Sequence, residues 1–521
     1  MDLRRGLRSR GLELFAAAAV MAALASAAVV YVRRQGWTLY YGDAEAHLNI
    51  ARRIVDSRTP GYDQIGTVWL PLPHLIMLPF VGNDAWWRSG FAGALPSAIA
   101  YCAAGLFFFL AFRRLLGVAP SLAALAVFAL NPNLLYLAAT PMSEPVSFAA
   151  LALLFWATLR YADRPTALWA AVCGIANLLA ALARYEGWFV IPFVALFLLV
   201  RGGRRRWLYA LLFSVIASLG PLWWLIHNFW LYGDPLAFFR GPYSAQAIYQ
   251  RALDAGMARY PGDHNWPVAI RYFAAALKSS VLWPAIALAL AGAVVALWRK
   301  QWWALAFLAL PPVFYVLSLH SGSTPIFLPS LYPFSYYNTR YALAGLPLLA
   351  FCAGALALAA PARWRIPASA AIALLALAAW LLPPRPDSVL VWKEGRVNGA
   401  GRRAWTHTAA AYLSAHYQTG DGVVASFGDL TGIFRAAGIP LRQTLHEGNI
   451  PFFDLAIANP RVFLHEKWAI AFSGDRVATA IVRAHRAGPR YDRVLVITGP
   501  NSPVVEIYRR SHGVPLPPSL E

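Results

Sequence analysis

Three side chains that can carry or accept protons lie close together near the start of the chain. Asp43, Glu45 and His47 occur in the stretch YYGDAEAHLNIARRI, residues 40–54. A carboxylate can take the proton of a hydroxyl group as that group attacks a substrate, which is general-base chemistry. The residues after Gly42 follow a helical pattern, so the alternative role for Asp43 is an N-cap. Asp43 and His47 would share one face of the helix because they are four residues apart, whereas Glu45 would point elsewhere.

Two further acids stand in short turns between apolar runs. Glu144 lies in ATPMSEPVSF, and Glu186 lies in LARYEGWFV, where an ion pair with Arg184 is its alternative role. Polar groups at the edge of a membrane are costly unless they have a function. Three acids at the same predicted membrane level therefore favour a shared site.

A late loop adds a cation and aromatic rings. Residues 321–340 read SGSTPIFLPSLYPFSYYNTR, and Tyr337, Arg340 and Tyr341 lie at or just after the end of this loop. An arginine beside tyrosines is suited to bind a phosphate or a lipid headgroup. The alternative is a belt of aromatic residues at the membrane surface, with an arginine that extends to the water.

The elements that must position these residues are membrane-spanning helices. The chain has 521 residues, of which 59% are hydrophobic and 13% charged, whereas a soluble protein carries about 25% charged residues. About 20 apolar residues cross a bilayer, and fewer suffice when aromatic or basic residues flank the run. We therefore predict a polytopic α-helical membrane protein with about eleven spans, at 12–32, 90–112, 119–139, 143–160, 167–183, 187–200, 207–232, 281–298, 302–320, 341–360 and 367–383. The first run is not a secretory signal, because it is too long and ten more runs follow.

Basic residues in the short loops give an orientation. Clusters of Arg and Lys at 4–10, 113–114, 160–164, 201–206, 299–300 and 363–365 fall on one side of the predicted membrane. By the positive-inside rule this side, with the N-terminus, is cytoplasmic, and the location is the plasma (inner) membrane. The net charge of +21 is then mostly a topology signal with some attraction to membrane lipids. We predict no nucleic-acid binding, because these cations are scattered over many loops.

The composition changes near residue 384, which predicts two domains. Residues 1–383 form the membrane domain, whose first outer loop covers 33–89. The short helix at 44–57 within this loop has an apolar face with Ile50 and Ile54, which predicts a helix lying on the membrane surface. Residues 384–521 are more charged and form a small α/β domain outside the cell membrane, with strands at 423–427, 468–472, 494–498 and 504–508. Helices are expected at 403–417 and 476–488.

The layout resembles that of the GT-C glycosyltransferases, in particular the group of dolichyl-phosphate-mannose protein mannosyltransferases and aminoarabinose transferases. The resemblance covers residues 1 to about 383 and rests on the signatures GDAE, SEP, RYEGW and YYNTRY. It implies that Asp43 is the catalytic residue, that Glu144 is the second acid, and that Arg340 and Tyr341 form the late Arg-Tyr pair. The protein mannosyltransferases have adjacent Asp and Glu, whereas Ala44 separates the two here. This departure leaves open whether Glu45 is a third catalytic residue.

The family chemistry implied by this resemblance is sugar transfer from a polyprenyl-phosphate-linked donor. The sugar would be a mannose-like hexose or a pentose, moved with inversion to a hydroxyl group of an acceptor lipid, glycan or protein on the outer face. Asp43 would be the general base. The leaving lipid phosphate gains negative charge, so Arg184 and Arg340, with Tyr337, Tyr341, Glu186 and His47 around them, are the candidates for donor binding. Relatives differ in their use of a divalent metal, so a metal between Asp43 and Glu144 stays open.

A transporter or lipid flippase is the alternative function. Such a protein is expected to have broken helices or ionisable residues near the middle of the bilayer, often in paired repeats. The central parts of the predicted spans carry almost no charge, and Asn177 and His227 are their main polar residues. The enzyme is therefore the favoured prediction. A membrane scaffold without catalysis is the remaining alternative.

Overall fold

The computed structural model describes residues 2–242, 244–322, 324–381, 389–487, 489–500 and 502–511. The chain divides into two compact units. The first comprises Met1–Trp37, Thr67–Pro73 and Ala94–Glu394, and the second comprises Thr38–Gly66, His74–Gly93 and Gly395–Glu521. Most of the predicted first outer loop thus belongs to the same unit as the C-terminal segment. The predicted boundary between 383 and 384 lies outside the described residues.

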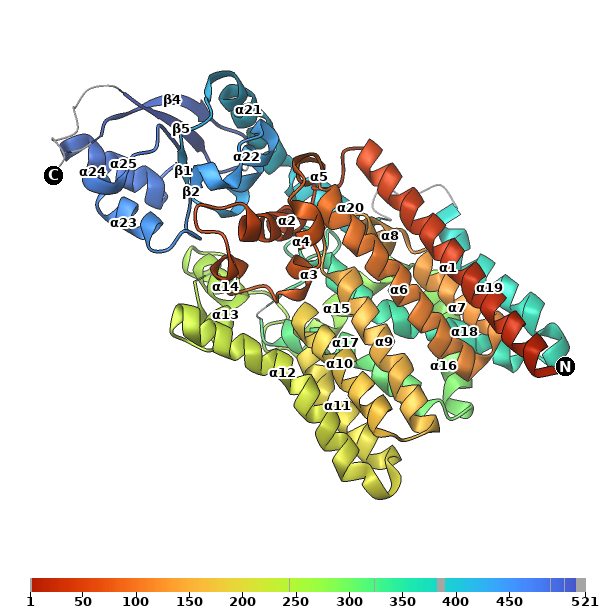
Figure 1. The fold of residues 1–521 in the computed structure, drawn as a ribbon. Coiled ribbons are helices and arrows are strands. Elements are labelled where there is room, and N and C mark those ends of the chain that lie inside the picture. The colour runs from red at the N-terminus through yellow and green to blue at the C-terminus, as the bar shows by residue number, and fades with distance from the viewer. Residues whose placement is uncertain are drawn as a thin grey trace. The chain divides into compact units, whose positions relative to one another are not determined.

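The first unit is a bundle of helices, many of which run side by side in Figure 1. A bilayer offers no water to the backbone N–H and C=O groups of such apolar segments. A helix pairs these groups with one another within the segment. The helices are α1 (Asp2–Arg34), α6 (Phe91–Leu116), α7 (Val118–Ala129), α8 (Pro132–Ala138), α9 (Glu144–Asp163), α10 (Ala167–Ala183), α11 (Glu186–Arg201), α12 (Arg206–Tyr232), α13 (Ala237–Arg240), α14 (Ala245–Asp254), α15 (Trp266–Val281), α16 (Trp283–Trp298), α17 (Trp302–His320), α18 (Leu346–Leu356) and α19 (Arg365–Leu381). The boundary between the units falls within α20 (Leu390–Asn398), after Glu394.

The predicted class of polytopic helical membrane protein is confirmed. Over the described residues, seven helices are long and apolar enough to cross a membrane, and nine are if each of two bent pairs is one span. The other two predicted spans, 167–183 and 187–200, correspond to α10 and α11, with 17 and 16 residues. These two helices are shorter than the seven long spans, so the total of eleven stays a prediction. The last predicted span, 367–383, corresponds to α19, and its final two residues lie outside the described part.

The two bent pairs meet at their breaks. The first pair, α7 and α8, bends by 68°, and the second, α15 and α16, bends by 112°. The amides of Asn131 and Asn133, at the first break, donate to the carbonyl oxygen of Ser280, at the second, over 2.9 and 3.1 Å. Buried backbone that leaves a helix needs such partners. The protein itself therefore satisfies the Ser280 carbonyl freed by the second break.

The second unit contains a five-stranded sheet in the order β2-β1-β3-β5-β4. The strands are β1 (Val423–Ala425), β2 (Thr444–Leu445), β3 (Trp468–Phe472), β4 (Tyr491–Ile497) and β5 (Val505–Arg510). The first three run parallel, whereas β5 is antiparallel to β3 and β4. The predicted C-terminal α/β domain is confirmed. The two-residue strand β2 was not predicted, because it is too short to show an alternating pattern.

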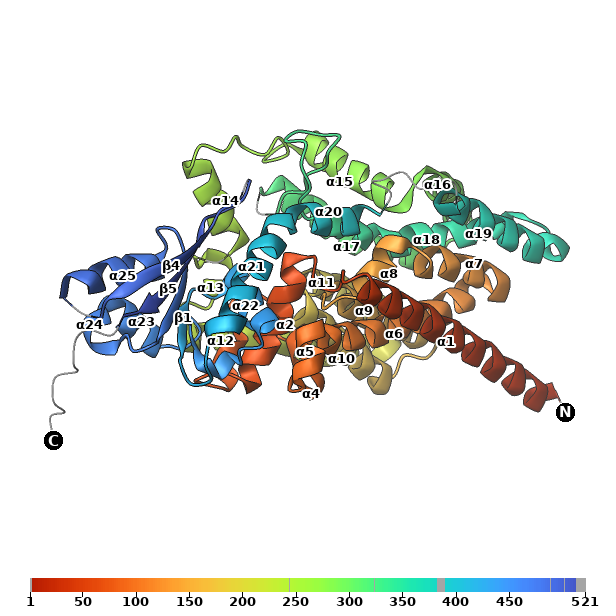
Figure 2. The same ribbon diagram turned by 90° about the horizontal axis from the view of Figure 1, so that it is seen from above.

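Helices cover both faces of this sheet, as Figure 2 shows. The alternate residues Val424, Ala469 and Ala471 pack with α23 (Phe452–Ala458) and α25 (Arg476–Ala487), with α24 (Pro460–Phe463) beside them. The opposite face, including Val423 and Ile470, packs with α21 (Ala400–His416) and α22 (Thr431–Ala437). This alternation follows from the two-residue period of a strand.

Short helices of the first outer loop pack on the same face of the sheet as α21 and α22. These are α2 (Gly42–Val55), α4 (Leu78–Val81) and α5 (Asp84–Ser89), and they place Leu48, Ala51, Val81 and Trp87 in the same core as the sheet. The prediction that residues 44–57 lie on a membrane surface is therefore wrong, since the apolar face of α2 packs inside this unit. The proline-rich segment at 68–81 forms only two short helices, α3 (Leu72–Leu75) and α4.

Candidate functional site

The candidate residues form two groups, one in each unit. The group in the first unit, here called the arginine cluster, consists of Glu144, Arg184, Glu186, Tyr315, Arg340 and Tyr341. The other group, here called the α2 cluster, consists of the polar residues of α2 and their partners. Tyr337 belongs to neither group. Its backbone pairs with that of Phe327, and the residue is 41% exposed.

Two arginines and two acids meet in the arginine cluster. Glu144 Oε1 accepts hydrogen bonds from Arg184 Nη1 over 3.0 Å and from Arg340 Nε over 2.9 Å. Arg184 Nε donates to Glu186 Oε1 over 2.9 Å. The pairing of Arg184 with Glu186 is thus confirmed, and Glu144 joins it. Arg340 is only 5% exposed, so the alternative of an arginine that extends to the membrane surface is wrong.

Tyrosines complete the arginine cluster. The rings of Tyr315 and Tyr341 stack with their centroids 4.8 Å apart, and Arg184 Nη2 donates to the Tyr315 hydroxyl oxygen over 2.5 Å. Both guanidinium groups lie near the ring of Tyr341, at 5.2 Å from Arg184 and 4.8 Å from Arg340. Such cation–π contacts favour cations in a partly dehydrated place. Tyr315 was missed from the sequence, since it is one of many aromatic residues in its span.

The helix ends explain why these residues meet. Glu144 and Glu186 are the first residues of α9 and α11, where a carboxylate interacts favourably with the helix dipole. Arg340 lies in the short 3-10 helix η3 (Thr339–Gly345), just before α18. Glu394 holds this turn, because its carboxylate accepts from the backbone N–H groups of Asn338 and Thr339, each over 2.8 Å. The first turns of three helices and the end of α17 therefore form one buried polar site.

One oxygen of the arginine cluster has no partner. Glu144 is 5% exposed, and among the described residues its Oε2 atom accepts no hydrogen bond. A buried oxygen without a donor costs about 1–3 kcal/mol. The cavity beside it is only about 10 Å³, which is room for about one water molecule. A larger ligand must therefore separate the arginines from the acids when it enters.

The fit of a metal ion to these residues is poor. No group of three or more His, Cys, Asp or Glu side chains in the described ranges is placed to hold one. Glu144, one of the two acids considered for a metal, lies within hydrogen-bond distance of two guanidinium groups, which repel a cation. We therefore assign no step to a metal.

Glu45, in the α2 cluster, is held by two arginines of the C-terminal segment. Its Oε1 accepts from Arg435 Nε over 2.8 Å, and its Oε2 accepts from Arg402 Nη1. Arg402 also donates to the carbonyl oxygens of Leu39 and Tyr40, at 3.0 and 2.9 Å. With both oxygens occupied by cations, Glu45 is suited to fix the start of α2 rather than to accept a proton.

Other polar residues of α2 hold the helix in the same way. The amide of Asn49 donates to the Thr431 hydroxyl oxygen over 3.0 Å. Arg52 pairs with Asp56 and Asp84 at 2.7 and 2.6 Å, and Asp56 also accepts from the backbone N–H of Leu441 over 3.1 Å. These contacts leave α2 little freedom to shift within its unit.

Asp43 does not cap α2. The N-cap of α2 is Tyr41, and it makes no side-chain cap. The prediction of Asp43 as N-cap is therefore wrong: Asp43 lies one residue inside the helix and is half-buried. Capping does not explain why an acid occurs here.

His47 contacts a histidine that the sequence did not single out. Its Nδ1 lies 2.8 Å from Nε2 of His74, and both rings are buried. Burial, with smaller effects of His47 and Arg53, holds the pKa of His74 well below its usual value. His74 is therefore neutral near pH 7.

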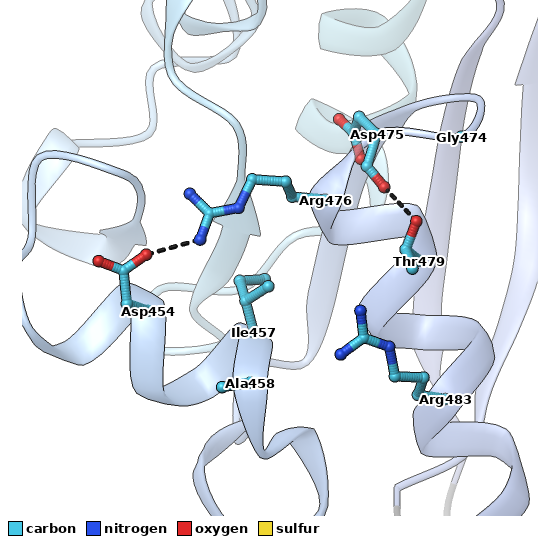
Figure 3. A pocket seen from close by; sticks show the side chains of 8 residues that line it. All are labelled: Asp454, Ile457, Ala458, Gly474, Asp475, Arg476, Thr479 and Arg483. Carbon is cyan, nitrogen blue, oxygen red and sulfur yellow. Dashed lines mark hydrogen bonds and ion pairs between the residues drawn. The ribbon is translucent and has the colours of Figure 1, made fainter. Parts of the chain in front are cut away.

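A separate cavity of about 360 Å³ lies between α23 and α25 (Figure 3). Arg476 pairs there with Asp454 at 2.6 Å, and the Thr479 hydroxyl donates to the carbonyl oxygen of Asp475 over 2.8 Å. None of the predicted site residues lines this cavity, and we assign it no role in the chemistry.

Comparisons with known proteins give fold likenesses at low identity. No family model matches the chain, and no curated protein matches it. Among solved structures, ArnT from Cupriavidus metallidurans in the apo state is 14% identical, with 92% of this chain and 97% of that chain covered and a TM-score of 0.47. The Archaeoglobus fulgidus oligosaccharyltransferase in complex with Zn and sulfate is 12% identical, with 87% and 68% covered and a TM-score of 0.49. The A. fulgidus oligosaccharyltransferase AglB, in complex with an inhibitory peptide and a dolichol-phosphate, is 13% identical, with 91% and 71% covered and a TM-score of 0.41.

These structures come from GT-C glycosyltransferases, the superfamily that the sequence layout resembles. All three TM-scores are below 0.5. The function of this chain is therefore argued below from its own residues.

Proposed function

We propose that the chain is a membrane glycosyltransferase that moves a sugar from a polyprenyl-phosphate donor to an acceptor hydroxyl group. The observation that carries this proposal is the arginine cluster. It places two guanidinium groups, one buried and one largely buried, with two tyrosines and a carboxylate that has an unpaired oxygen, at the ends of membrane helices. A lipid phosphate with an attached sugar offers an anion for the arginines and hydroxyl groups for the free oxygen.

Arg184 and Arg340 stabilise the leaving phosphate. As the bond between the sugar and the phosphate breaks, negative charge grows on the phosphate oxygens, and nearby fixed cations lower the energy of that state. In the structure Glu144 covers both arginines. Donor binding therefore exchanges a carboxylate for a phosphate as the partner of Arg340.

Asp43 is the general base. It takes the proton of the acceptor hydroxyl while the hydroxyl oxygen forms a bond to the anomeric carbon. The bond from this carbon to the phosphate oxygen breaks, and the polyprenyl phosphate leaves with the electron pair. Attack opposite the leaving group inverts the anomeric centre. Glu45 keeps α2 in place by its bonds to Arg402 and Arg435.

The contacts at the helix breaks count against the transporter. Broken helices in transporters leave carbonyl oxygens that coordinate ions or substrate. Here two asparagine amides already occupy the carbonyl oxygen of Ser280. The buried ionic residues Glu144, Glu186 and Arg340 lie instead in the first turns of their helices.

Loss of the gene tests this function and identifies the sugar. A strain without the enzyme should accumulate one polyprenyl-phosphate-linked sugar, because its consumption stops while its synthesis continues. Mass analysis of the lipid extract, with a strain carrying the restored gene as the control, measures this. If the polyprenyl-linked sugars are unchanged, donor use by this chain is contradicted.

The topology has its own test. We expect the basic segment 201–206 to be cytoplasmic and the C-terminal domain to be on the outer side, from the positive-inside rule. In a cysteine-free parent, Arg204→Cys should resist a membrane-impermeant thiol reagent in intact cells, and Ile450→Cys should react. Both positions are exposed in the structure. A difference in labelling therefore reports the side of the membrane and not burial within the protein. Labelling at 204 without labelling at 450 would reverse the orientation.

A further inference from the structure

The rings of His47 and His74 are joined by a hydrogen bond. The atoms that meet are Nδ1 of His47 and Nε2 of His74, 2.8 Å apart, with the ring centroids at 5.0 Å. A neutral imidazole has one N–H donor and one acceptor nitrogen, so one ring must donate and the other accept. His47 is 4% exposed and His74 is fully buried.

The other nitrogen of His74 decides the direction of the bond. Among the described residues, His74 Nδ1 is buried and has no hydrogen-bond partner. A proton on Nδ1 would create a buried N–H group without an acceptor, which proteins almost always avoid, whereas an unfilled acceptor is tolerated more often. His74 therefore carries its proton on Nε2 and donates it to His47 Nδ1. Neutral His47 must then carry its own proton on Nε2.

The position of His47 on α2 relates its N–H group to Asp43. His47 follows Asp43 by four residues on α2, so both side chains project from the same face of that helix. A fixed N–H group on this face can donate a hydrogen bond to an anionic oxygen. This oxygen can belong to the phosphate of the sugar lipid or to the carboxylate of the base.

We propose that His74 is a positioning residue that holds His47 in the tautomer with the proton on Nε2, so that His47 presents an N–H donor on the face of α2 that carries Asp43. The proposal rests on the proposed function for its catalytic consequence. The tautomer itself does not depend on that function, because it follows from the ring–ring bond and from Nδ1 of His74, which has no partner among the described residues. If the pair served only to fill the core, a shape-conserving replacement of His74 would leave catalysis unchanged.

Two replacements of His74 separate these roles. Gln retains an N–H donor, so His74→Gln should keep most of the activity. Phe keeps a flat ring but no donor, so in His74→Phe we expect kcat to fall by about tenfold, as is typical when the group that orients a functional histidine is lost. The KM for the lipid donor should be nearly unchanged. His446→Gln is the matched control, since His446 is also buried in this unit with an unpaired nitrogen, and it should leave kcat unchanged.

Nitrogen NMR of protein labelled with ¹⁵N-histidine shows which ring nitrogen of His47 carries the proton. A purely packing role of His74 would not change this. The parent should show His47 with a protonated Nε2 and an unprotonated Nδ1, assigned by the signals that disappear in His47→Asn. His74→Phe should lose this single tautomer, and His74→Gln should keep it.

The proposal is overturned if the parent has the proton on His47 Nδ1, or if folded His74→Phe turns over at the parent rate. If His74→Phe does not fold, the parent spectrum and His74→Gln decide. If the parent transfers no sugar at all, the proposed function fails, but the spectrum still tests the tautomer.

Discussion

Asp43→Asn should abolish most sugar transfer while the protein stays folded. Asparagine has nearly the same shape but cannot take a proton, so kcat should fall by about a hundredfold or more, the usual range for loss of a general base. The change also removes a negative charge from the first turn of α2, which costs only about 0.3–1 kcal/mol of stability. Transfer from a polyprenyl-phosphate sugar by purified variants in lipid, with thermal unfolding alongside, measures both quantities.

Two further variants make this result specific. Asp43→Glu keeps a base but displaces it, so a small part of the activity should remain. Asp63→Asn changes an exposed acid of the same loop and should transfer sugar like the parent. Transfer at the parent rate by Asp43→Asn would remove Asp43 as the base. Glu144 would then be the next candidate, because Glu45 has both carboxylate oxygens bonded to arginines.

Arg340→Ala should weaken donor binding by about 10- to 100-fold, the effect of losing a charged hydrogen bond of about 1.5–3 kcal/mol. Arg340→Lys should recover only part of the affinity, since lysine lacks the planar fork that binds two oxygens of a phosphate. Glu144→Gln should act in the opposite direction on affinity. It removes the negative charge that competes with the phosphate for Arg184 and Arg340.

The controls for this prediction concern folding. Removal of one partner of a buried ion pair commonly costs about 3–5 kcal/mol, although Arg184 still pairs with Glu144 in Arg340→Ala. Donor affinity is therefore measured on variants shown to be monodisperse. Arg113→Ala breaks a different ion pair of the same unit, with Glu13, and should bind donor like the parent. Unchanged donor affinity in both Arg340 variants would exclude this residue from the donor site.

The arginine cluster was largely predictable from the sequence. Glu144, Arg184, Glu186 and Arg340 all lie at ends of apolar runs, and the alternation of spans across a membrane brings such ends to the same side. The pairing was less predictable, because the bond between Arg340 and Glu144 joins residues 196 positions apart. Local patterns also gave the strands β1, β3, β4 and β5, since their apolar residues are continuous or alternate.

The surroundings of α2 were not predictable. An apolar helix face has the same sequence pattern whether it meets lipid or a protein core, and the partners Arg402 and Arg435 follow Glu45 by 357 and 390 positions. Asp43 was predicted as an N-cap because a glycine precedes it, but the helix begins at that glycine. His74 lies in a proline-rich segment that gives no periodic signal, so nothing in the sequence pointed to its bond with His47.

Sugar transfer by the purified protein tests the central claim most directly. The protein is reconstituted in lipid, a polyprenyl-phosphate sugar identified in the gene-deletion strain is added together with membrane extract as the acceptor source, and mass spectrometry follows release of the polyprenyl phosphate. We expect release with the parent protein and a rate about a hundredfold or more lower with Asp43→Asn. The absence of release by folded parent protein, or equal release by parent and Asp43→Asn, would contradict the account.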